Sequence, residues 1–508
     1  MTKKSFRKMT ALLIVGALWV HHQRVQAEEA TPAPCARETG PQAHGMPSTD
    51  RIYGWTADMT HFGERRTGTP AIEQAAAYVK CKLESLGVEN VHYETTPSWK
   101  WETTRHALRV NGRAIDSYPA AFTYVKPDQP SVFTTGPNGM DAPLVDVGAG
   151  SATMVNLTDV RGKIVLFDLK FQVPLVAFTP LLEFMWDPQL TIVEKNSFMG
   201  NPYQTNMSSV VKRLMDAGAV GFVGVLSDYF DSNKYHNEYY RRLQVTIPGQ
   251  WVTKTEGAML RALMKANKGR VTANMVMDGS RTWAPAHAVI GVLPGKSKDT
   301  ILVTSHHDSV WNGAVEDASG VASVLAQAQV AASKPASERE KTLMFVTMDS
   351  HFTGYQVHQM FAKKYLIDKA TPYNIVGNVT LEHIGKQGVI ENGKLVMREQ
   401  MEVLGVLENL APSLQKTLKS SIRQHDVRRM GMLSAKLLCS EGIGMPTDAS
   451  FTCIAGVPTA SLIAAPIYLY DQADTLDKVA KDKLQPVAKV FADLIEAMDK
   501  TPSDKMGR

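Results

Sequence analysis

Three clusters of histidine and carboxylate residues hold the side chains with which this sequence could bind a metal ion. The clusters contain, in chain order, His306 with Asp308, Asp349 with His351, and Glu382 with His383. Imidazole nitrogens and carboxylate oxygens are ligands that zinc and related divalent ions take in proteins. A metal-binding histidine commonly has its second nitrogen held by a carboxylate, a role that fits Asp308 beside His306. The residue types therefore predict a metal centre that could activate water.

The stretch NGAVEDASG adds two further carboxylates, Glu316 and Asp317. They could cap the small-residue helix that follows, because acidic side chains are favourable at a helix N-terminus. Metal ligation is the preferred interpretation of Glu316, because the inferred fold brings it near His306 and Glu382. Asp317 and Asp471 remain alternative ligands.

The clusters need strands that end at one edge of a sheet. Apolar runs predict strands over 288–292, 300–305, 342–347 and 375–381, and helical spacing predicts helices over 320–333 and 355–365. This alternation predicts a largely parallel sheet with helices on both faces. Each cluster directly follows one of the strands, and the chemistry of such folds lies at the carboxyl ends of the strands.

The N-terminal residues are typical of a secretory signal. Basic residues precede an apolar run over 10–20, and Val25, Gln26 and Ala27 supply a cleavage site. The apolar run is too short to span a bilayer, although a retained anchor is an alternative. We expect export to the periplasm or the medium. The segment holds five basic and no acidic residues, so its removal takes the net charge from +5 to 5 − 5 = 0. Nucleic acid is a poor partner for such a chain.

The chain contains four cysteines, Cys35, Cys81, Cys439 and Cys453. An even number in an exported protein favours disulfides. Sequence does not fix the pairing, and we prefer Cys35–Cys81 and Cys439–Cys453 because these pairs close the shorter loops.

Several motifs resemble the zinc aminopeptidase and glutamate carboxypeptidase family of clan MH, peptidase family twenty-eight. HHDSVWNGAVEDASG resembles the family's H-x-D…G-x-x-D-x-x-S-G block, and TLMFVTMDSHFTGYQVHQMF aligns with F-x-x-x-D-x-E-E-x-G-L-x-G-S. VTLEHIG and GVPTASLIAAPIYLYDQADTLD match two later segments. VRGKIVLFD and DAGAVGFVGVL resemble the protease-associated domain that is often inserted in these enzymes.

The resemblance implies an α/β fold, a three-layer sandwich with a mostly parallel mixed sheet, plus an inserted β-rich protease-associated domain. The predicted divisions are a signal peptide at 1–27, a tether at 28–50, the metallopeptidase-like domain at 51–114 and 281–500, and the inserted domain at 115–280. The chain of 508 residues exceeds the roughly 250–300 residues at which single cores stop growing.

The family's site, carried over by position, has two zinc ions that share a carboxylate. His306 and its orienting partner Asp308 are retained, and Glu316 and Glu382 stand where the family has aspartates. These changes keep a carboxylate that is one methylene longer. His306, Glu316 and Glu382 would therefore form one complete set of metal ligands.

The other half of the family's site is altered. His351 replaces the general-base glutamate, Phe352 replaces a ligand glutamate, and Tyr470 replaces the C-terminal ligand histidine. Phe352 cannot bind a metal, and a neutral Tyr470 is a poor ligand. His351 could act as the base, since imidazole titrates near neutrality, or it could be a fourth ligand.

The resulting expectation is an exported metallopeptidase-like hydrolase with one divalent ion, zinc by preference, acting on a peptide or a small amide. One alternative is an inactive relative that serves as a binding protein. Another is acyl or cyclisation chemistry at a single zinc on the same fold, because a fold does not decide a reaction.

Overall fold

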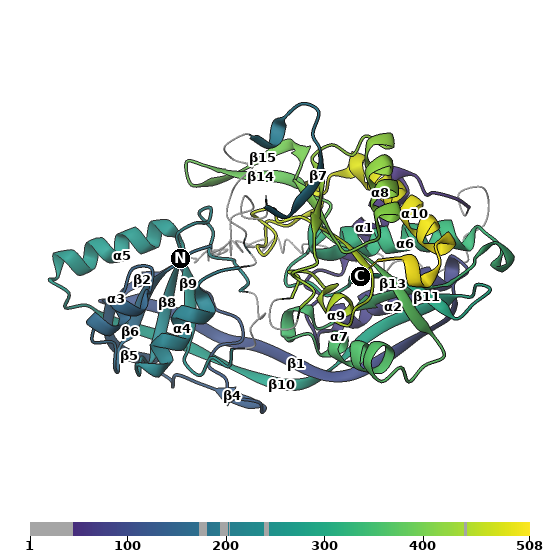
Figure 1. Ribbon diagram of the computed structural model, residues 1–508. Helices are drawn as coiled ribbons and strands as arrows, with labels where there is room; N and C mark the ends of the chain where they lie inside the picture. Colours follow the sequence, from purple (N-terminus) through teal and green to yellow (C-terminus); the bar gives the residue numbers. More distant parts are fainter. Residues whose placement is uncertain are drawn as a thin grey trace, which may run out of the picture. The chain divides into compact units, whose positions relative to one another are not determined.

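The computed structural model describes residues 44–171, 180–193, 202, 204–237, 243–440 and 444–507 (Figure 1). The predicted signal peptide and Cys35 lie outside these ranges. No helix in the described ranges is both long and apolar enough to cross a bilayer. Cys439 and Cys453 form the predicted disulfide, and Cys81 is also disulfide-bonded.

The strands that position the clusters belong to a part of a large mixed sheet that extends to one of its ends. They are β10 (Thr272–Leu293), β12 (Thr342–Met348), β11 (Asp299–His306), β13 (Asn374–Leu381), β18 (Thr459–Ile463), β16 (Leu404–Glu408), β17 (Met430–Ser434) and β7 (Leu182–Trp186), in spatial order. β12, β11, β13 and β18 run parallel to their neighbours within this group. β10 and β16 pair antiparallel at its two sides.

Helices cover both faces of these strands. The helices of this part are α1 (Thr49–His61), α2 (Pro70–Ser85), α6 (Ser319–Ala332), α7 (Gln356–Phe361), α8 (Pro412–Gln424), α9 (Ser450–Ile454) and α10 (Lys481–Lys500). Alternate residues of β12 explain the two layers, because successive strand side chains point to opposite faces. Leu343 and Phe345 belong to the core that includes α1, α6 and α10, whereas Met344 and Val346 pack with α7. The predicted three-layer α/β arrangement is therefore confirmed.

A long antiparallel ladder joins these strands to residues 115–280. β1 (Glu89–Val110) pairs with β10 along nearly its whole length (Figure 1). The remaining strands are β2 (Arg113–Ile115), β3 (Tyr118–Pro119), β4 (Ser131–Phe133), β5 (Met140–Asp146), β6 (Ile164–Leu169), β8 (Gly221–Leu226), β9 (Gly249–Val252), β14 (Lys386–Glu391) and β15 (Lys394–Met401). β14 and β15 form a separate hairpin.

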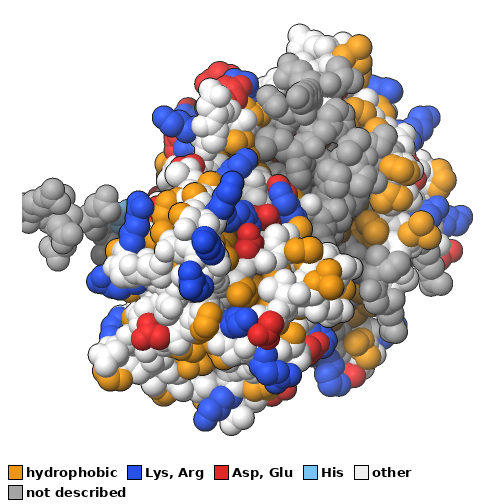
Figure 2. All heavy atoms as spheres, turned by 90° about the vertical axis from the view of Figure 1, so that its left-hand side faces the viewer, with side chains coloured by type: hydrophobic (Ala, Val, Ile, Leu, Met, Phe, Trp, Pro, Cys, Tyr) orange, Lys and Arg blue, Asp and Glu red, His pale blue; other side chains and the backbone are white. Residues whose placement is uncertain are grey.

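Residues 115–280 contain helices as well as strands. β5, β6, β8 and β9 are parallel neighbours. The helices are α3 (Ala152–Leu157), α4 (Met207–Asp216) and α5 (Lys254–Ala266). α4 precedes β8, and α5 follows β9. Figure 2 shows basic and acidic side chains interspersed with apolar ones on one face of the molecule. The division at 115 and 280 stays a prediction.

Candidate metal centre

The three clusters lie at one edge of the sheet. β11 ends at His306, and its parallel neighbours β12 and β13 end just before Asp349 and Glu382. His306, His351 and Glu382 are at most 2% exposed. The strand ends thus collect ionisable side chains in a buried environment, where an uncompensated charge is costly.

Glu316 is the side chain on which the other groups converge. Its Oε1 lies 3.3 Å from Nε2 of His306 and 3.9 Å from Nε2 of His351. Its Oε2 lies 2.6 Å from Nε2 of His383. One carboxylate therefore faces three imidazole rings, two of them through the same oxygen.

The two histidines that face Oε1 each have a carboxylate next to Nδ1, the other ring nitrogen. Nδ1 of His306 lies 3.1 Å from Oδ1 of Asp308, and Nδ1 of His351 lies 2.8 Å from Oδ1 of Asp448. The two rings stack with centroids 4.1 Å apart. A carboxylate behind Nδ1 takes the N–H there and leaves the Nε2 lone pair for a metal. Both rings have this arrangement.

A buried arginine fixes the loop between β11 and α6. The guanidinium of Arg65 donates hydrogen bonds to the backbone carbonyls of His307, Asn312 and Gly313. Arg65 is fully buried, and burial lowers its pKa to about 10 against the opposing effect of nearby carboxylates such as Asp474. The side chain remains charged and ties the loop to the rest of the domain.

Two further contacts place Glu316 itself. The Asp474 carboxylate accepts hydrogen bonds from the backbone N–H groups of Val315 and Glu316. At Gly320, a Cβ atom would approach Asp317 Oδ2 to 2.2 Å and the Leu381 carbonyl to 2.4 Å. The start of α6 can therefore lie against the end of β13 only because residue 320 is glycine.

The carboxylates of the site favour a positive charge beside them. Burial alone would lower the pKa of His306, but Asp448, Asp308 and Glu316 raise it well above its ordinary value. Burial likewise opposes ionisation of His383, yet Glu316 raises its pKa to about 10. For Glu316, the effect of burial is outweighed by His383 and His306, so its pKa is lowered. The same negative potential that binds protons here would favour a divalent ion.

Among the described residues, ligand atoms of His306, Glu316 and His351 lie within 4.8 Å of one another, close enough to share an ion. Glu382, the third ligand expected from the sequence, accepts a hydrogen bond from the Asp448 N–H at 3.1 Å. Burial, reinforced by Asp448, raises the pKa of Glu382 to about 8. Glu382 thus lies beside His306, Glu316 and His351, and Asp448 connects it to His351.

The alternative ligands have other partners. Asp317 accepts hydrogen bonds from the hydroxyl of Ser305 and the backbone N–H of His383, and its Oδ2 is 4.0 Å from His306 Nε2. Asp471 accepts a hydrogen bond from Ser232. Asp317 is therefore a neighbour of the group, whereas Asp471 bonds to a loop of the 115–280 part.

An aromatic cluster lies against the two histidines, with the Phe352 ring 4.7 Å from that of His351 and 6.0 Å from that of His306. The rings of Phe352 and Tyr470 meet edge to face at 5.7 Å, and His236 contacts Phe352 in the same way at 5.4 Å. The His236 N–H also donates to the Tyr470 carbonyl. Residues that stand at ligand positions of the resembled family thus form a packed ring cluster.

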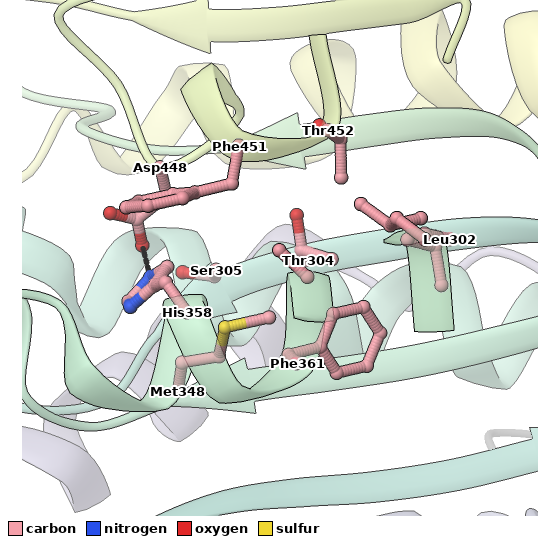
Figure 3. Close-up of a pocket in the computed structure, with 11 residues that line it drawn as sticks. Leu302, Thr304, Ser305, Met348, His358, Phe361, Asp448, Phe451 and Thr452 are labelled. Carbon is pink, nitrogen blue, oxygen red and sulfur yellow. Dashed lines mark ion pairs between the residues drawn. The ribbon is translucent and has the colours of Figure 1, made fainter. Parts of the chain in front are cut away.

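Sequence reasoning missed Asp448. It lies two residues before α9, outside any periodic pattern, and it is buried between two histidines. Its Oδ2 is 2.9 Å from Nε2 of His358, which projects from α7 (Figure 3). His358 is thus a buried partner of Asp448.

Two further residues reach partners that their local sequence does not indicate. Strand alternation would direct His383 away from Glu382, but His383 follows the end of β13 with φ of 60°, so alternation no longer applies and its ring reaches Glu316. Asp474 accepts hydrogen bonds from Val315 and Glu316, which are distant in sequence.

Comparison with protein families identifies the region that holds the site. Residues 288–495 match the model of peptidase family M28. No curated protein sequence matches the chain significantly.

Solved structures with the same fold include three bacterial proteins. An M28 peptidase precursor from Shewanella amazonensis superposes with a TM-score of 0.64 at 17% identity, over 91% of this chain and 95% of that one. A zinc aminopeptidase from Bacillus subtilis gives 0.61 at 16% identity, over 91% and 98%. An aminopeptidase from Aneurinibacillus sp. strain AM-1 gives 0.58 at 19% identity, over 88% and 93%. These likenesses show the fold.

Proposed function

Because residues 288–495 of the chain belong to peptidase family M28, we propose that the protein is a metal-dependent hydrolase of peptide bonds with a single-ion centre. One observation carries the proposal. His306 and His351 both direct Nε2 toward Oε1 of Glu316, and each has a carboxylate behind Nδ1. We assign the three residues as the ligands.

The atoms of this group fit a cation. Oε2 of Glu316 is paired with Nε2 of His383, and Oε1 of Glu316 faces Nε2 of His306 at 3.3 Å. The surrounding carboxylates raise the pKa of His306 and so favour a proton on its Nε2. An ion that replaces this proton would face the Nε2 lone pair and the Oε1 atom, two acceptors that otherwise repel each other. Nitrogen and oxygen ligands with room for a fourth partner suit zinc.

The aromatic cluster of Phe352, Tyr470 and His236 favours the binding of one ion over the binding of two. Phe352 has no ligand atom, and its ring packs between those of Tyr470 and His236. A second ion bound there would lack the side chains that complete its coordination. The sequence-based expectation of one ion per chain is retained as part of the proposal.

The residues around the ion would divide the work. A bound zinc ion would polarise a substrate carbonyl and make water a stronger acid. Asp308 and Asp448 fix the orientation of the two imidazoles. His383 neutralises one oxygen of Glu316 and leaves the other for the ion.

Glu382 is then the group that accepts a proton from the attacking water. It is buried, and its pKa of about 8 would fall when a cation binds beside it. The sequence suggested His351 for this step. We favour Glu382 as the proton acceptor. His351, like the assigned ligand His306, has a carboxylate next to Nδ1, which fits a metal ligand.

The proposed substrates are peptides with a free N-terminus, because relatives of the same fold are described as aminopeptidases. We also propose that the protein is exported. The disulfide between Cys439 and Cys453 supports this, since such bonds persist mainly outside the reducing cytoplasm.

Metal analysis of the purified full-length mature protein, combined with a peptide library, tests the proposal. We expect one zinc per chain and release of N-terminal residues from free peptides, with little action on acetylated ones. His351→Ala should lose the ion and the activity together. A matched control is His425→Ala, which removes a histidine paired with Asp493 at the end of α8 and should keep both. A His351→Ala protein that keeps its ion would contradict the assignment, as would two tightly bound ions in the wild type.

A further inference from the structure

Asp448 bridges two histidines, of which His351 lies between β12 and α7 and His358 lies on α7. Its Oδ1 lies 2.8 Å from Nδ1 of His351, and its Oδ2 lies 2.9 Å from Nε2 of His358. Asp448, His351 and His358 are 6%, 2% and 2% exposed, so water does not compete for these contacts. Both oxygens of one carboxylate are thus directed by imidazole rings.

The backbone of Asp448 is held at the same place. Its N–H donates to Oε1 of Glu382. The loop that carries Asp448 is therefore attached to the end of β13, and its side chain reaches back to the residues that follow β12. Three separate segments of the chain meet at this one residue.

His358 has surroundings that favour its pairing with Asp448. Its ring contacts those of Tyr355 and Phe451 at 5.2 and 5.7 Å. Figure 3 shows Asp448 and His358 at one end of a cavity that apolar side chains such as Leu302, Phe361 and Phe451 line. A cavity of about 10 Å³ has room for one water at most. The His358 ring is therefore the close neighbour of Oδ2, with its Nε2 at 2.9 Å.

We infer that Asp448 and His358 form a positioning pair, in which His358 fixes the Asp448 carboxylate and Asp448 fixes the tautomer and the direction of the His351 ring. Nδ1 of His351 carries the proton and Nε2 points to Glu316. The inference rests on the proposed function in one respect only, that the ring so fixed is a ligand of the ion. Partners of this kind commonly change metal affinity about 10- to 100-fold when they are removed.

Cobalt affinity of the full-length mature protein, measured by competition with a chelator, is the first test. We expect Asp448→Asn to weaken the affinity about 10- to 100-fold, because the neutral amide loses the negative charge and one of the two acceptor oxygens, so that it holds the Nδ1–H tautomer of His351 less firmly. Asp499→Asn is the matched control. Asp499 is a buried aspartate at the distant end of α10 that accepts from the Lys341 N–H, and its change should leave the affinity at the wild-type value.

Two replacements of His358 separate positioning from packing. His358→Gln keeps an N–H that can reach Asp448 Oδ2, so we expect near-wild-type affinity. His358→Phe keeps the ring contacts with Tyr355 and Phe451 but has no donor, so we expect weaker binding, in the direction of Asp448→Asn. Equal affinities for the two variants would overturn the role of His358.

The tautomer of His351 supplies a readout that needs no metal. In protein labelled with ¹⁵N-histidine, long-range proton–nitrogen spectra should show His351 protonated at Nδ1 in the wild type and in His358→Gln. Asp448→Asn should lower the population of this form. If the wild type binds no cobalt, the proposed metal centre is wrong, and the tautomer still decides the positioning role. An unchanged tautomer in Asp448→Asn would overturn the inference.

Discussion

The site has a polar side and an aromatic side, which differ in what they can offer to an ion. On the polar side, His306 and His351 present ring nitrogens, and each ring has a carboxylate within 3.1 Å of its Nδ1. On the aromatic side, Phe352 and Tyr470 meet as packed rings 5.7 Å apart, and the Phe352 ring lies 4.7 Å from that of His351. The polar side keeps both its ligand atoms and the groups that orient them, whereas the aromatic side has become part of the hydrophobic core.

This difference bears on whether the site is a remnant or a working centre. Loss of function would remove the constraint on buried polar groups, which are costly to keep without a purpose. The chain instead keeps a fully buried cluster of histidines and carboxylates on one side only. The comparison therefore favours a centre reduced from two ions to one over an inactive relative.

The largest effect on the polar side is expected from Glu316→Gln. We expect loss of the bound ion and a fall of about 3–5 kcal/mol in the free energy of unfolding, because the imidazolium of His383 would be buried without its partner. Metal analysis and urea unfolding measure the two effects. Glu399→Gln, at a side chain that is 97% exposed, should stay within about 0.5 kcal/mol of the wild type. A Glu316→Gln protein that retains its ion would refute the central place of this carboxylate.

Glu382→Gln separates the proton acceptor from the ligands on the polar side. We expect it to keep one ion per chain and to lower turnover about 10²- to 10⁴-fold, the usual contribution of a positioned acid–base group. Kinetics on a cleaved peptide and metal analysis of the same sample make the test. Loss of the ion would show instead that Glu382 is a ligand, as the sequence first suggested.

The aromatic side can be tested by restoring ligand atoms there. Phe352→Glu combined with Tyr470→His should raise the metal content to two ions per chain in excess zinc, because Phe352 lies against His306 and His351 and Tyr470 lies against Phe352. Phe352→Glu alone should lower stability without adding an ion, since a buried carboxylate with one partner is costly. A double variant that still binds one ion would mean that the backbone has moved away from a two-ion geometry.

The smallest expected effect concerns the support of Glu316 by Asp474. Burial raises the pKa of Asp474 from 3.8 to about 7, although the Val315 and Glu316 N–H groups oppose the shift. The folded state then binds more protons than the unfolded state, so this contribution to stability is complete below about pH 4 and is lost as pH rises through about 7. In metal-free protein, the free energy of unfolding should fall between pH 5 and pH 8 by about 1–3 kcal/mol less in Asp474→Asn than in the wild type. Urea unfolding at the two pH values checks it, and parallel curves for both proteins would contradict it.

The sheet could be predicted because its signals are local. Apolar runs over 300–305 and 342–347 correspond to β11 and β12 within one or two residues. The polar residues after them then follow from the rule that parallel strands end at one edge. His306 and Glu316 were accessible to the same reasoning, although their assignment as ligands remains a proposal.

Asp448 could not be predicted in this way. It lies 97 residues from His351, and its loop has no periodicity from which a position in space could be inferred. His383 shows a different limit, since a single left-handed residue after β13 reverses the direction that strand alternation assigns. The local sequence pattern determines helices and strands. The carboxylate that pairs with a buried histidine, such as Asp448 with His351, depends on loops that only the folded chain brings together.

The disulfide between Cys439 and Cys453 has a consequence for when the site can form. Asp448 lies between these two cysteines in the sequence, and a cross-link over a loop of about 15 residues removes about 3 kcal/mol of unfolded-chain entropy. A newly made chain in a reducing compartment lacks this restraint on the loop that fixes His351. Under the proposed export, oxidation of these cysteines would be a maturation step that completes the site after synthesis.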